Sequence, residues 1–364
     1  MDLNTDKVTL TINGQQYWGW QELRATSHLK TGAADFDIGV SEAWEDALEK
    51  PWQITAGSSC VLALDGDPIV TGYVDEYGPG YDPDSHRVRI TGRSKTCDLV
   101  DCMPEVEAGQ FIGYTLDAMA RTISQPFGIG VVVEASMGAP NADFTIQRCE
   151  TAWEFLEKFA RARSVLLTDD ESGNLVLTQA SSAISPSRLV EGQNIFRAQA
   201  KLSMAKRWSK YSVRTQQGLT YQNNNAVQTD VLGTATDAAV PRYRPRETMP
   251  GTPMDTATAT AYATWQKLHC TGESMTAEIT VVGWRDAAGS VWRKNVLIGV
   301  TSPRLALDRQ LLIVGVEFTL DAEKGMFTKL TLAPPEAFTP EPIETQAGAG
   351  LWANVQKVTG GGAS

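Results

Sequence analysis

Histidine, serine and lysine residues at suggestive spacings are the first candidates for catalytic chemistry. The three histidines, His28, His86 and His269, lie in different predicted segments without a nearby nucleophile pattern, so no catalytic triad is supported. Ser203-Met-Ala-Lys206 matches the SxxK motif of penicillin-recognising enzymes and Lys30-Thr31-Gly32 matches their KTG motif. The order of the two is reversed, however, and no SDN motif lies between them. We therefore attribute both matches to chance.

Cysteine and aspartate residues offer a second kind of chemistry, metal binding. The five cysteines form no CxxC pair and no Cys/His cluster with zinc spacing, so we expect small buried side chains in a reducing compartment. They are Cys60, Cys97, Cys102, Cys149 and Cys270. Asp65-Gly66-Asp67 and Asp82-Pro83-Asp84 stand where hairpins must turn and lack EF-hand spacing. We expect no metal, no cofactor and no catalytic residue.

Carboxylates and aromatic side chains keep two other functions open. Glu154 and Glu157, on one predicted helix, are the nearest carboxylate pair for a cell-wall hydrolase, although a solvated pair is the simpler interpretation. Four tryptophans would suit a carbohydrate-binding β-module, but large aromatics more often fill a barrel core. They are Trp18, Trp20, Trp284 and Trp292. Basic and aromatic residues between 201 and 214 resemble a single-strand binding face. Strand alternation splits them between two faces, so we prefer a solvated strand beside acidic neighbours.

Length and charge restrict the class of protein. The chain has 364 residues, of which 42% are hydrophobic and 21% charged, with a formal net charge of −11. This composition predicts a soluble protein of several domains, and its charge opposes broad attraction to phosphate. An acidic surface lining a DNA conduit stays compatible, because like charge prevents sticking. The N-terminus has no signal-peptide pattern and no window is apolar enough for a membrane span, so we expect a chain made and kept in the cytoplasm.

The first half of the chain divides into two predicted regions. Residues 1–100 read as a small antiparallel β-barrel, with a hairpin turn at Asn13-Gly14 and a short helix from Glu42 to Lys50. Residues 101–184 read as an α+β domain. They hold a helix before Pro126, a second helix opened by the capping box Thr151-Ala-Trp-Glu154, and a hairpin across residues 165–177.

The second half is predicted to be another barrel followed by a tail. Residues 185–335 read as the second β-barrel, interrupted at 218–274 by a long surface loop (218–254) and a helix capped by Asp255. Residues 336–364 form a Pro/Gly-rich tail that we do not expect to bury itself in either barrel. Within the tail an apolar stripe at helical spacing either docks on a partner or folds back on its own chain. Its residues are Leu351, Trp352, Val355 and Val358.

A partial repeat links the two predicted barrels. Asp65 is followed seven residues later by Gly72, and Asp308 is followed seven residues later by Gly315. Each copy then turns into an alternating strand, at residues 87–91 and 328–332. We interpret the aspartates as turn residues of a repeated building block. The predicted fold class is α+β, mainly β, with two similar small antiparallel β-barrels, an inserted α+β domain and a helix-containing insertion. Such duplication favours a ring-forming protein over an enzyme.

Nearly the whole chain resembles the central hub proteins of contractile-tail baseplates in Mu-like phages, whose kin include the late-control D proteins and the N-terminal part of type VI secretion spike proteins. The resemblance is carried by GDPIVTGYVDEY with ITGRSKTCDLVDC, by Thr151-Ala-Trp-Glu-Phe-Leu156, by Trp208-Ser-Lys-Tyr211, by Val282-Gly-Trp-Arg285 and by PRLALDRQLLIVGVEFTLD.

The resemblance implies a non-enzymatic virion protein of the phage tail, assembled in the host cytoplasm. In that family a homotrimer of two-barrel chains forms a pseudo-sixfold ring between the sixfold tail tube and the threefold central spike. The expected partners are the spike, the tube or its initiator and other baseplate proteins. DNA would be met only in transit through the channel, and no membrane insertion is expected.

Overall fold

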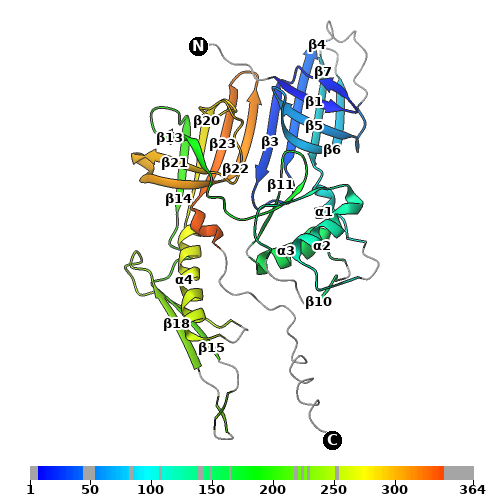
Figure 1. The fold of residues 1–364 in the computed structure, drawn as a ribbon. Coiled ribbons are helices and arrows are strands. Elements are labelled where there is room, and N and C mark those ends of the chain that lie inside the picture. Colours follow the sequence, from blue (N-terminus) through cyan, green and yellow to red (C-terminus); the bar gives the residue numbers. More distant parts are fainter. Residues whose placement is uncertain are drawn as a thin grey trace, which may run out of the picture.

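The computed structural model describes residues 7–43, 54–81, 85–105, 109–137, 143–147, 149–163, 165–216, 220–222, 225–227, 230–250 and 254–339. Strands predominate, and a 13-stranded sheet runs through the upper part of the molecule in Figure 1, with two smaller parts below it. The predicted fold class, α+β and mainly β, is confirmed. Within these residues no helix is long and apolar enough to cross a membrane.

Ten strands of the large sheet form two five-strand units with the same connectivity. The first unit contains β3 (Glu22–His28), β4 (Asp35–Ala43), β5 (Ser59–Leu64), β6 (Asp67–Tyr81) and β7 (Ser85–Ser94). The second contains β14 (Arg197–Leu202), β20 (Met275–Val282), β21 (Leu297–Ser302), β22 (Leu307–Asp321) and β23 (Gly325–Ala333). In space the orders are β5-β6-β7-β4-β3 and β21-β22-β23-β20-β14, all antiparallel. Taken in chain order, β3, β4, β5, β6 and β7 thus correspond to β14, β20, β21, β22 and β23.

The two units differ in what is added at their edges. In the first unit β1 (Val8–Ile12) pairs antiparallel with β5 and continues into β2 (Gln15–Tyr17) through the predicted Asn13-Gly14 turn, where both residues have positive φ. In the second unit β13 (Ile184–Val190) pairs with β21 in parallel. The duplication therefore covers the five central strands and not their additions.

A single apolar core runs under both units. Alternate residues of β1, β4, β20 and β23 point into it, as their alternating sequence requires. Trp284 is fully buried, and Trp20 and Trp292 are almost so. Trp18 is exposed, with Lys7 over its ring. Three of the four tryptophans proposed for a carbohydrate site are therefore core residues.

The α+β region follows β7 and packs its own core. Its helices are α1 (Cys97–Asp101), α2 (Leu116–Ser124) and α3 (Ala152–Ala162), and its strands are β8 (Gln110–Ile112), β9 (Val131–Val133), β10 (Asp143–Thr145), β11 (Leu166–Asp169) and β12 (Leu175–Thr178). The predicted capping box opens α3, since the Thr151 side chain accepts from Glu154 N and Glu154 accepts from Thr151 N. A 3-10 turn (Gln125–Phe127) follows α2.

A third part contradicts the predicted loop at 218–254. Residues in that range form β16 (Thr220–Gln222), β17 (Asn225–Val227), β18 (Asp230–Thr236) and β19 (Pro245–Thr248). β18 and β19 flank β15 (Lys210–Gln216), and α4 (Thr256–Glu273), which Asp255 caps as predicted, packs on them. The loop prediction was wrong because the four prolines and the asparagine run of this range were read as breakers. Pro245 begins an edge strand, and Gly233 lets the α4 backbone approach closely.

Two other boundaries also differ from expectation. The helix predicted from Glu42 is contradicted at its start, because β4 continues through Ala43; residues 44–50 lie outside the described residues. The predicted tail begins with a 3-10 turn (Pro335–Phe338) whose Ala337 and Phe338 are buried, so its first residues do pack on the fold. The apolar stripe Leu351, Trp352, Val355 and Val358 lies outside the described residues.

Candidate functional site

The two five-strand units meet at a joint made by β22 and β3, which lie side by side in the middle of Figure 1. The ladder is antiparallel and runs from Gly315 opposite His28 to Asp321 opposite Glu22. One edge of β22 therefore pairs with β21 along its first half and with β3 along its second half. The other edge of β22 pairs with β23. This joint is the feature through which one unit builds onto another.

Charged side chains of both signs lie at and beside the joint on the polar face of the sheet. Arg24 of β3 and Lys329 of β23 both contact Glu317 of β22, at 3.5 and 2.8 Å. Farther along, Arg89 of β7 donates from Nε to Asp37 of β4 at 2.9 Å. Because these pairs are partly exposed, each contributes little to stability. On this face Arg24, Lys329 and Arg89 are thus each paired with a carboxylate.

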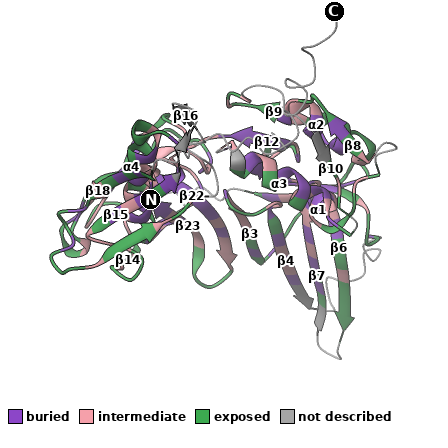
Figure 2. Ribbon diagram, turned by 90° about the horizontal axis from the view of Figure 1, so that it is seen from below, coloured by how far each residue is buried: buried purple, intermediate pink, exposed green. Residues whose placement is uncertain are grey.

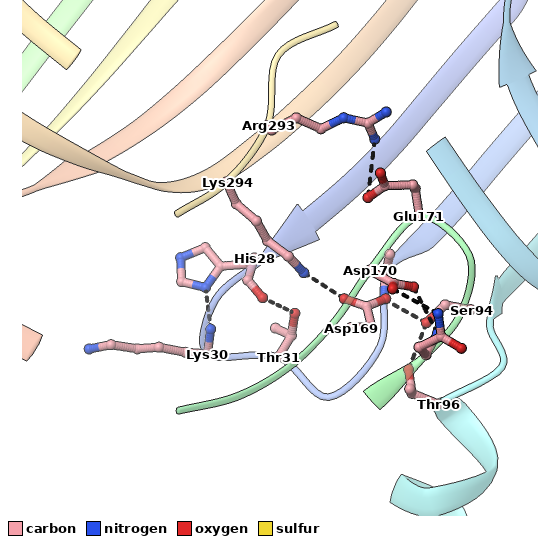
Figure 3. Close-up of polar contacts among 12 residues, drawn as sticks. His28, Lys30, Thr31, Ser94, Thr96, Asp169, Asp170, Glu171, Arg293 and Lys294 are labelled. Atoms are coloured by element: carbon pink, nitrogen blue, oxygen red, sulfur yellow. Dashed lines mark hydrogen bonds and ion pairs between the residues drawn. The ribbon is translucent and has the colours of Figure 1, made fainter. Parts of the chain in front are cut away.

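A buried ion pair ties the α+β region to both units (Figure 3). Asp169, the last residue of β11, accepts from Ala34 N of the first unit at 2.8 Å and from Lys294 Nζ, just before the second unit's β21, at 2.5 Å. The side chains of Asp169 and Lys294 are only 1% and 12% exposed. Ser94 Oγ also accepts from Ala34 N, and it shares a hydrogen bond with Thr96. One carboxylate thus joins three parts of the chain.

Neighbouring contacts widen this connection. Arg293 lies 3.5 Å from Glu171, and the Thr71 hydroxyl of β6 donates to the Glu171 carbonyl at 2.7 Å. Beside Asp169 and Lys294 is a cavity of about 190 Å³. The hairpin turn next to Asp169 is held by Asp170, whose carboxylate accepts from the N–H groups of Ser172 and Asn174.

His28 lies at the edge of the same connection. Its Nδ1 accepts from Lys30 N at 3.1 Å, which requires the neutral ring. Burial lowers the pKa of His28, and the nearby charges of Lys30 and Lys294 lower it further. The ring therefore serves the fold as a neutral acceptor (Figure 3).

Acidification is expected to destabilise the protein through His28. The pKa of His28 is near 6.5 in the unfolded chain and lower in the folded protein. As the pH falls below about 6.5, the unfolded chain therefore binds the proton first. The free energy of unfolding then declines until the pH has passed the folded-state pKa. Urea unfolding of the wild type and His28→Gln at pH 7.5 and 5.5 checks this. The wild type should lose a few tenths of a kcal/mol more than the variant, because solvent screens the partly exposed ring. Equal losses in both proteins would contradict it.

The repeat landmarks occupy different positions in the two units. Asp65 lies in the turn between β5 and β6 and has positive φ, as a turn residue does. Asp308 lies inside β22 opposite Thr301, so its interpretation as a turn residue was wrong. Gly72 pairs with Ser94 before the β6 bulge, whereas Gly315 pairs with Thr331 just after the β22 bulge. The strand order, rather than the Asp-Gly spacing, carries the repetition.

The candidate catalytic residues have structural partners. Glu154 belongs to the capping box and Glu157 binds Arg161, as expected for a solvated pair. Ser203 and Lys206 line one cavity of about 450 Å³ with Lys30. Ser203, however, follows a strand instead of opening a helix, and its Oγ accepts from Ala205 N.

The cysteines and aspartates considered as metal ligands lie in different surroundings. Burial raises the pKa of the Cys60 thiol to about 12, which leaves it protonated at neutral pH. Cys102 and Cys149 are exposed, against the expectation of burial for all five. Among the described residues no group of three metal-ligating side chains gathers. Asp67 binds Arg285 at 2.7 Å, and residues 82–84 lie outside the described residues.

The basic segment 201–214 is divided as its strand alternation predicts. Arg207 binds Asp237 and Arg214 binds Glu247, while Tyr211 is buried. The expectation of acidic neighbours is confirmed for these two arginines. Two arginines of a later segment pack against the same region: Arg246 lies over the Trp208 ring and Arg244 donates to the Ala205 carbonyl.

Sequence reasoning missed the Asp169–Lys294 pair and the β22–β3 joint. The two charged residues are 125 positions apart and belong to different predicted domains. The only available signal was weak: Asp169 stands two residues after the apolar run 165–167 and ends the mostly buried strand β11.

Models of Mu-phage baseplate protein domains match most of the chain. Residues 7–94 match the N-terminal domain of GpP-like baseplate assembly proteins, residues 96–179 the second domain of gp44-like baseplate hub proteins, and residues 255–341 the fourth domain of the Mu baseplate assembly protein GpP.

Similar proteins extend the match along the chain. Baseplate hub protein gp44 of Escherichia phage Mu is 30% identical over 354 residues, covering 94% of this chain and 91% of gp44. The 43 kDa tail protein of prophage MuSo2 from Shewanella oneidensis is 32% identical with a TM-score of 0.79, covering 92% of this chain and 99% of its own. A tail protein from Neisseria meningitidis MC58 shares the fold at 21% identity, with a TM-score of 0.75 and coverage of 92% and 98%. The chain belongs to the Mu phage family of baseplate hub proteins, structural components of the phage tail.

Proposed function

We propose that three copies of this chain form a non-enzymatic ring with pseudo-sixfold symmetry. The observation that carries the proposal is the identical strand order of the two five-strand units. Two similar units in each of three chains give six similar units around one axis, and cyclic closure is common among homo-oligomers. Such a ring matches a sixfold partner through its units and a threefold partner through its chains.

The ring is proposed to adapt the sixfold tail tube to the threefold central spike. The tube or its initiator would meet the six units, and the apolar stripe Leu351, Trp352, Val355 and Val358 would dock on the spike. We assign residues 1–100 and residues 185–335, without the interruption at 218–274, to the ring. The parts within 101–184 and 218–274 would be peripheral and contact neighbouring copies or other baseplate proteins. The ring would assemble in the host cytoplasm and become part of the tail baseplate of the virion.

A channel for DNA in transit follows from the same arrangement. A sheet closed into a large ring turns one face to the bore, and large barrels keep a polar bore. The polar face of β3, β4, β22 and β23 suits that position. Its basic groups at Arg24, Lys329 and Arg89 are held by carboxylates, which limits their attraction for phosphate. Such pairing would keep DNA from sticking, as an acidic surface lining the conduit would.

The purified protein is expected to reach a mass three times the 39.5 kDa of one chain. Sedimentation velocity over a concentration series measures the mass, and negative-stain class averages of the largest species should show threefold symmetry with six similar lobes. Wild-type protein at low concentration is the internal control, because mass action should dissociate the ring.

A strictly monomeric protein at high concentration and low salt, both alone and with its spike protein, would overturn the proposed ring. A dimer or tetramer with no threefold averages would do the same. Clearing of peptidoglycan in a zymogram by the purified chain would instead support the cell-wall hydrolase.

A further inference from the structure

The outer edge of β14 and the second half of β6 are the counterparts of two strands that already pair within the chain. β14 corresponds to β3 and β6 to β22, and β22 pairs with β3 along residues 315–321. Among the described strands, β14 pairs only with β20, and β6 pairs only with β5 and β7. We infer that β14 of one copy pairs antiparallel with residues 76–81 of β6 in the next copy. This inference rests on the proposed ring and specifies its contact.

The bulges of β6 and β22 set the register on one side of this contact. In β6 the register shifts between Val74 and Glu76, and Glu76 then stands opposite Thr91. In β22 it shifts between Ile313 and Gly315, and Gly315 then stands opposite Thr331. Because bulges locally bend and twist a strand, the residues just after them are structural landmarks. Glu76 therefore corresponds to Gly315, and Gly78 to Glu317.

The fourth and fifth strands of the order set the register on the other side. Thr91 faces Asp37, which faces Arg24 of β3. Thr331 faces Glu278, which faces Gln199 of β14. Arg24 therefore corresponds to Gln199, and two residues later Thr26 corresponds to Lys201.

Transferring the internal ladder to the contact between copies gives definite partners. Within the chain Glu317 stands opposite Thr26 and Thr319 opposite Arg24. Between copies Gly78 then stands opposite Lys201, and Gly80 opposite Gln199. The same register puts Leu202 opposite Tyr77 on the apolar face of the sheet.

Exposure and position favour a second copy as the occupant. The two strands lie at opposite sides of the molecule, and both are largely exposed (Figure 2). Leu202 is 65% exposed, whereas its counterpart Ser27 pairs with β22 in the internal joint. In the proposed contact, Tyr77 of the next copy would cover Leu202. Glu76 would lie diagonally from Lys201, an attractive pairing of opposite charges. Edges at opposite sides make a head-to-tail contact, which closes into a ring when the rotation fits.

Pro79 makes the contact between copies weaker than the internal joint. Leu29 N donates to Val314 O, so by strand alternation Ala25 and Phe318 form a hydrogen-bonded pair. Their counterparts are Ala200 and Pro79, and proline has no N–H to donate. Each contact between copies thus has one hydrogen bond fewer, which suits a ring that assembles reversibly.

A disulfide between Gly78→Cys and Lys201→Cys tests the register. The corresponding internal pair, Glu317 and Thr26, is not hydrogen-bonded, and such pairs bring Cα atoms to roughly 4.5 Å, within disulfide range. A Cβ at Gly78 comes no closer than 3.6 Å to the Arg89 carbonyl oxygen, so cysteine fits. Exposed Cys102 and Cys149 are first replaced by serine. After mild oxidation of concentrated protein, non-reducing gels should show covalent dimers and trimers.

The matched control is Gly78→Cys with Arg197→Cys, four residues along β14 and on the same face. At about 3.3 Å per residue its cysteines would be too far apart, so we expect at least tenfold less covalent trimer. A trimeric mass with no cross-link above this control would overturn the strand contact and leave the ring standing. A monomeric mass at every concentration would overturn both.

Discussion

Replacing Asp169 with alanine should lower the free energy of unfolding by about 3–5 kcal/mol, because it leaves a buried cation without its anion. Asp169 accepts from Lys294 Nζ at 2.5 Å and from Ala34 N at 2.8 Å, and its side chain is 1% exposed. The variant would bury the Lys294 ammonium beside a cavity and leave Ala34 N with only the longer hydrogen bond that it donates to Ser94 Oγ, at 3.1 Å. Denaturant unfolding followed by far-UV circular dichroism measures the change.

Asp308→Ala is the matched control, since it also removes an aspartate paired with a basic residue. Its carboxylate lies 3.7 Å from Arg188 and its side chain is 80% exposed. Water screens such a pair, so its removal should cost less than about 1 kcal/mol.

The double variant Asp169→Ala with Lys294→Ala separates lost attraction from lost packing. Removing both charges should cost less than the sum of the single changes, because neither charge is then buried alone. A cost for Asp169→Ala similar to that for Asp308→Ala would show that Asp169 does not hold the three parts together.

Local signals predicted the elements whose cause is local. The Asn13-Gly14 hairpin, the Thr151–Glu154 capping box and the Asp255 cap all depend on residues within one turn of each other. Each was confirmed. Propensity and capping act over a few residues, so a single sequence contains the whole of their information.

Features that depend on tertiary partners could not be predicted in the same way. β18 was read as part of a loop because the range 218–254 holds an asparagine run and four prolines without periodicity, yet pairing with β15 and packing against α4 make it a strand. The Asp169–Lys294 pair joins regions 125 residues apart. The bulges that set the register of β6 and β22 have no clear sequence signature. The Asp-Gly echo therefore matched Gly315 with Gly72, whereas the ladders match Gly315 with Glu76, four residues later.

Gly72→Ala should lower the free energy of unfolding by about 3 kcal/mol or more, whereas Gly315→Ala should cost roughly 1 kcal/mol. A Cβ at Gly72 would lie 1.8 Å from the Arg93 carbonyl oxygen and 2.6 Å from Ser94 Cα, both backbone atoms of β7. Since Gly72 is paired with β5 on one edge and β7 on the other, the strands cannot separate without breaking ladders on either side.

At Gly315 the obstacle is a side chain. Its Cβ would lie 2.5 Å from His28 Cδ2 and 3.4 Å from Thr331 Cβ, so the imidazole can rotate at the cost of its bond from Lys30 N. Both glycines have ordinary strand backbones, and alanine restricts the unfolded chain equally in the two variants. Each variant is therefore the other's control in parallel urea titrations. Equal destabilisation would mean that β6 and β7 separate as easily as the His28 imidazole rotates. The contact with the β7 backbone would then not be the reason for glycine at position 72.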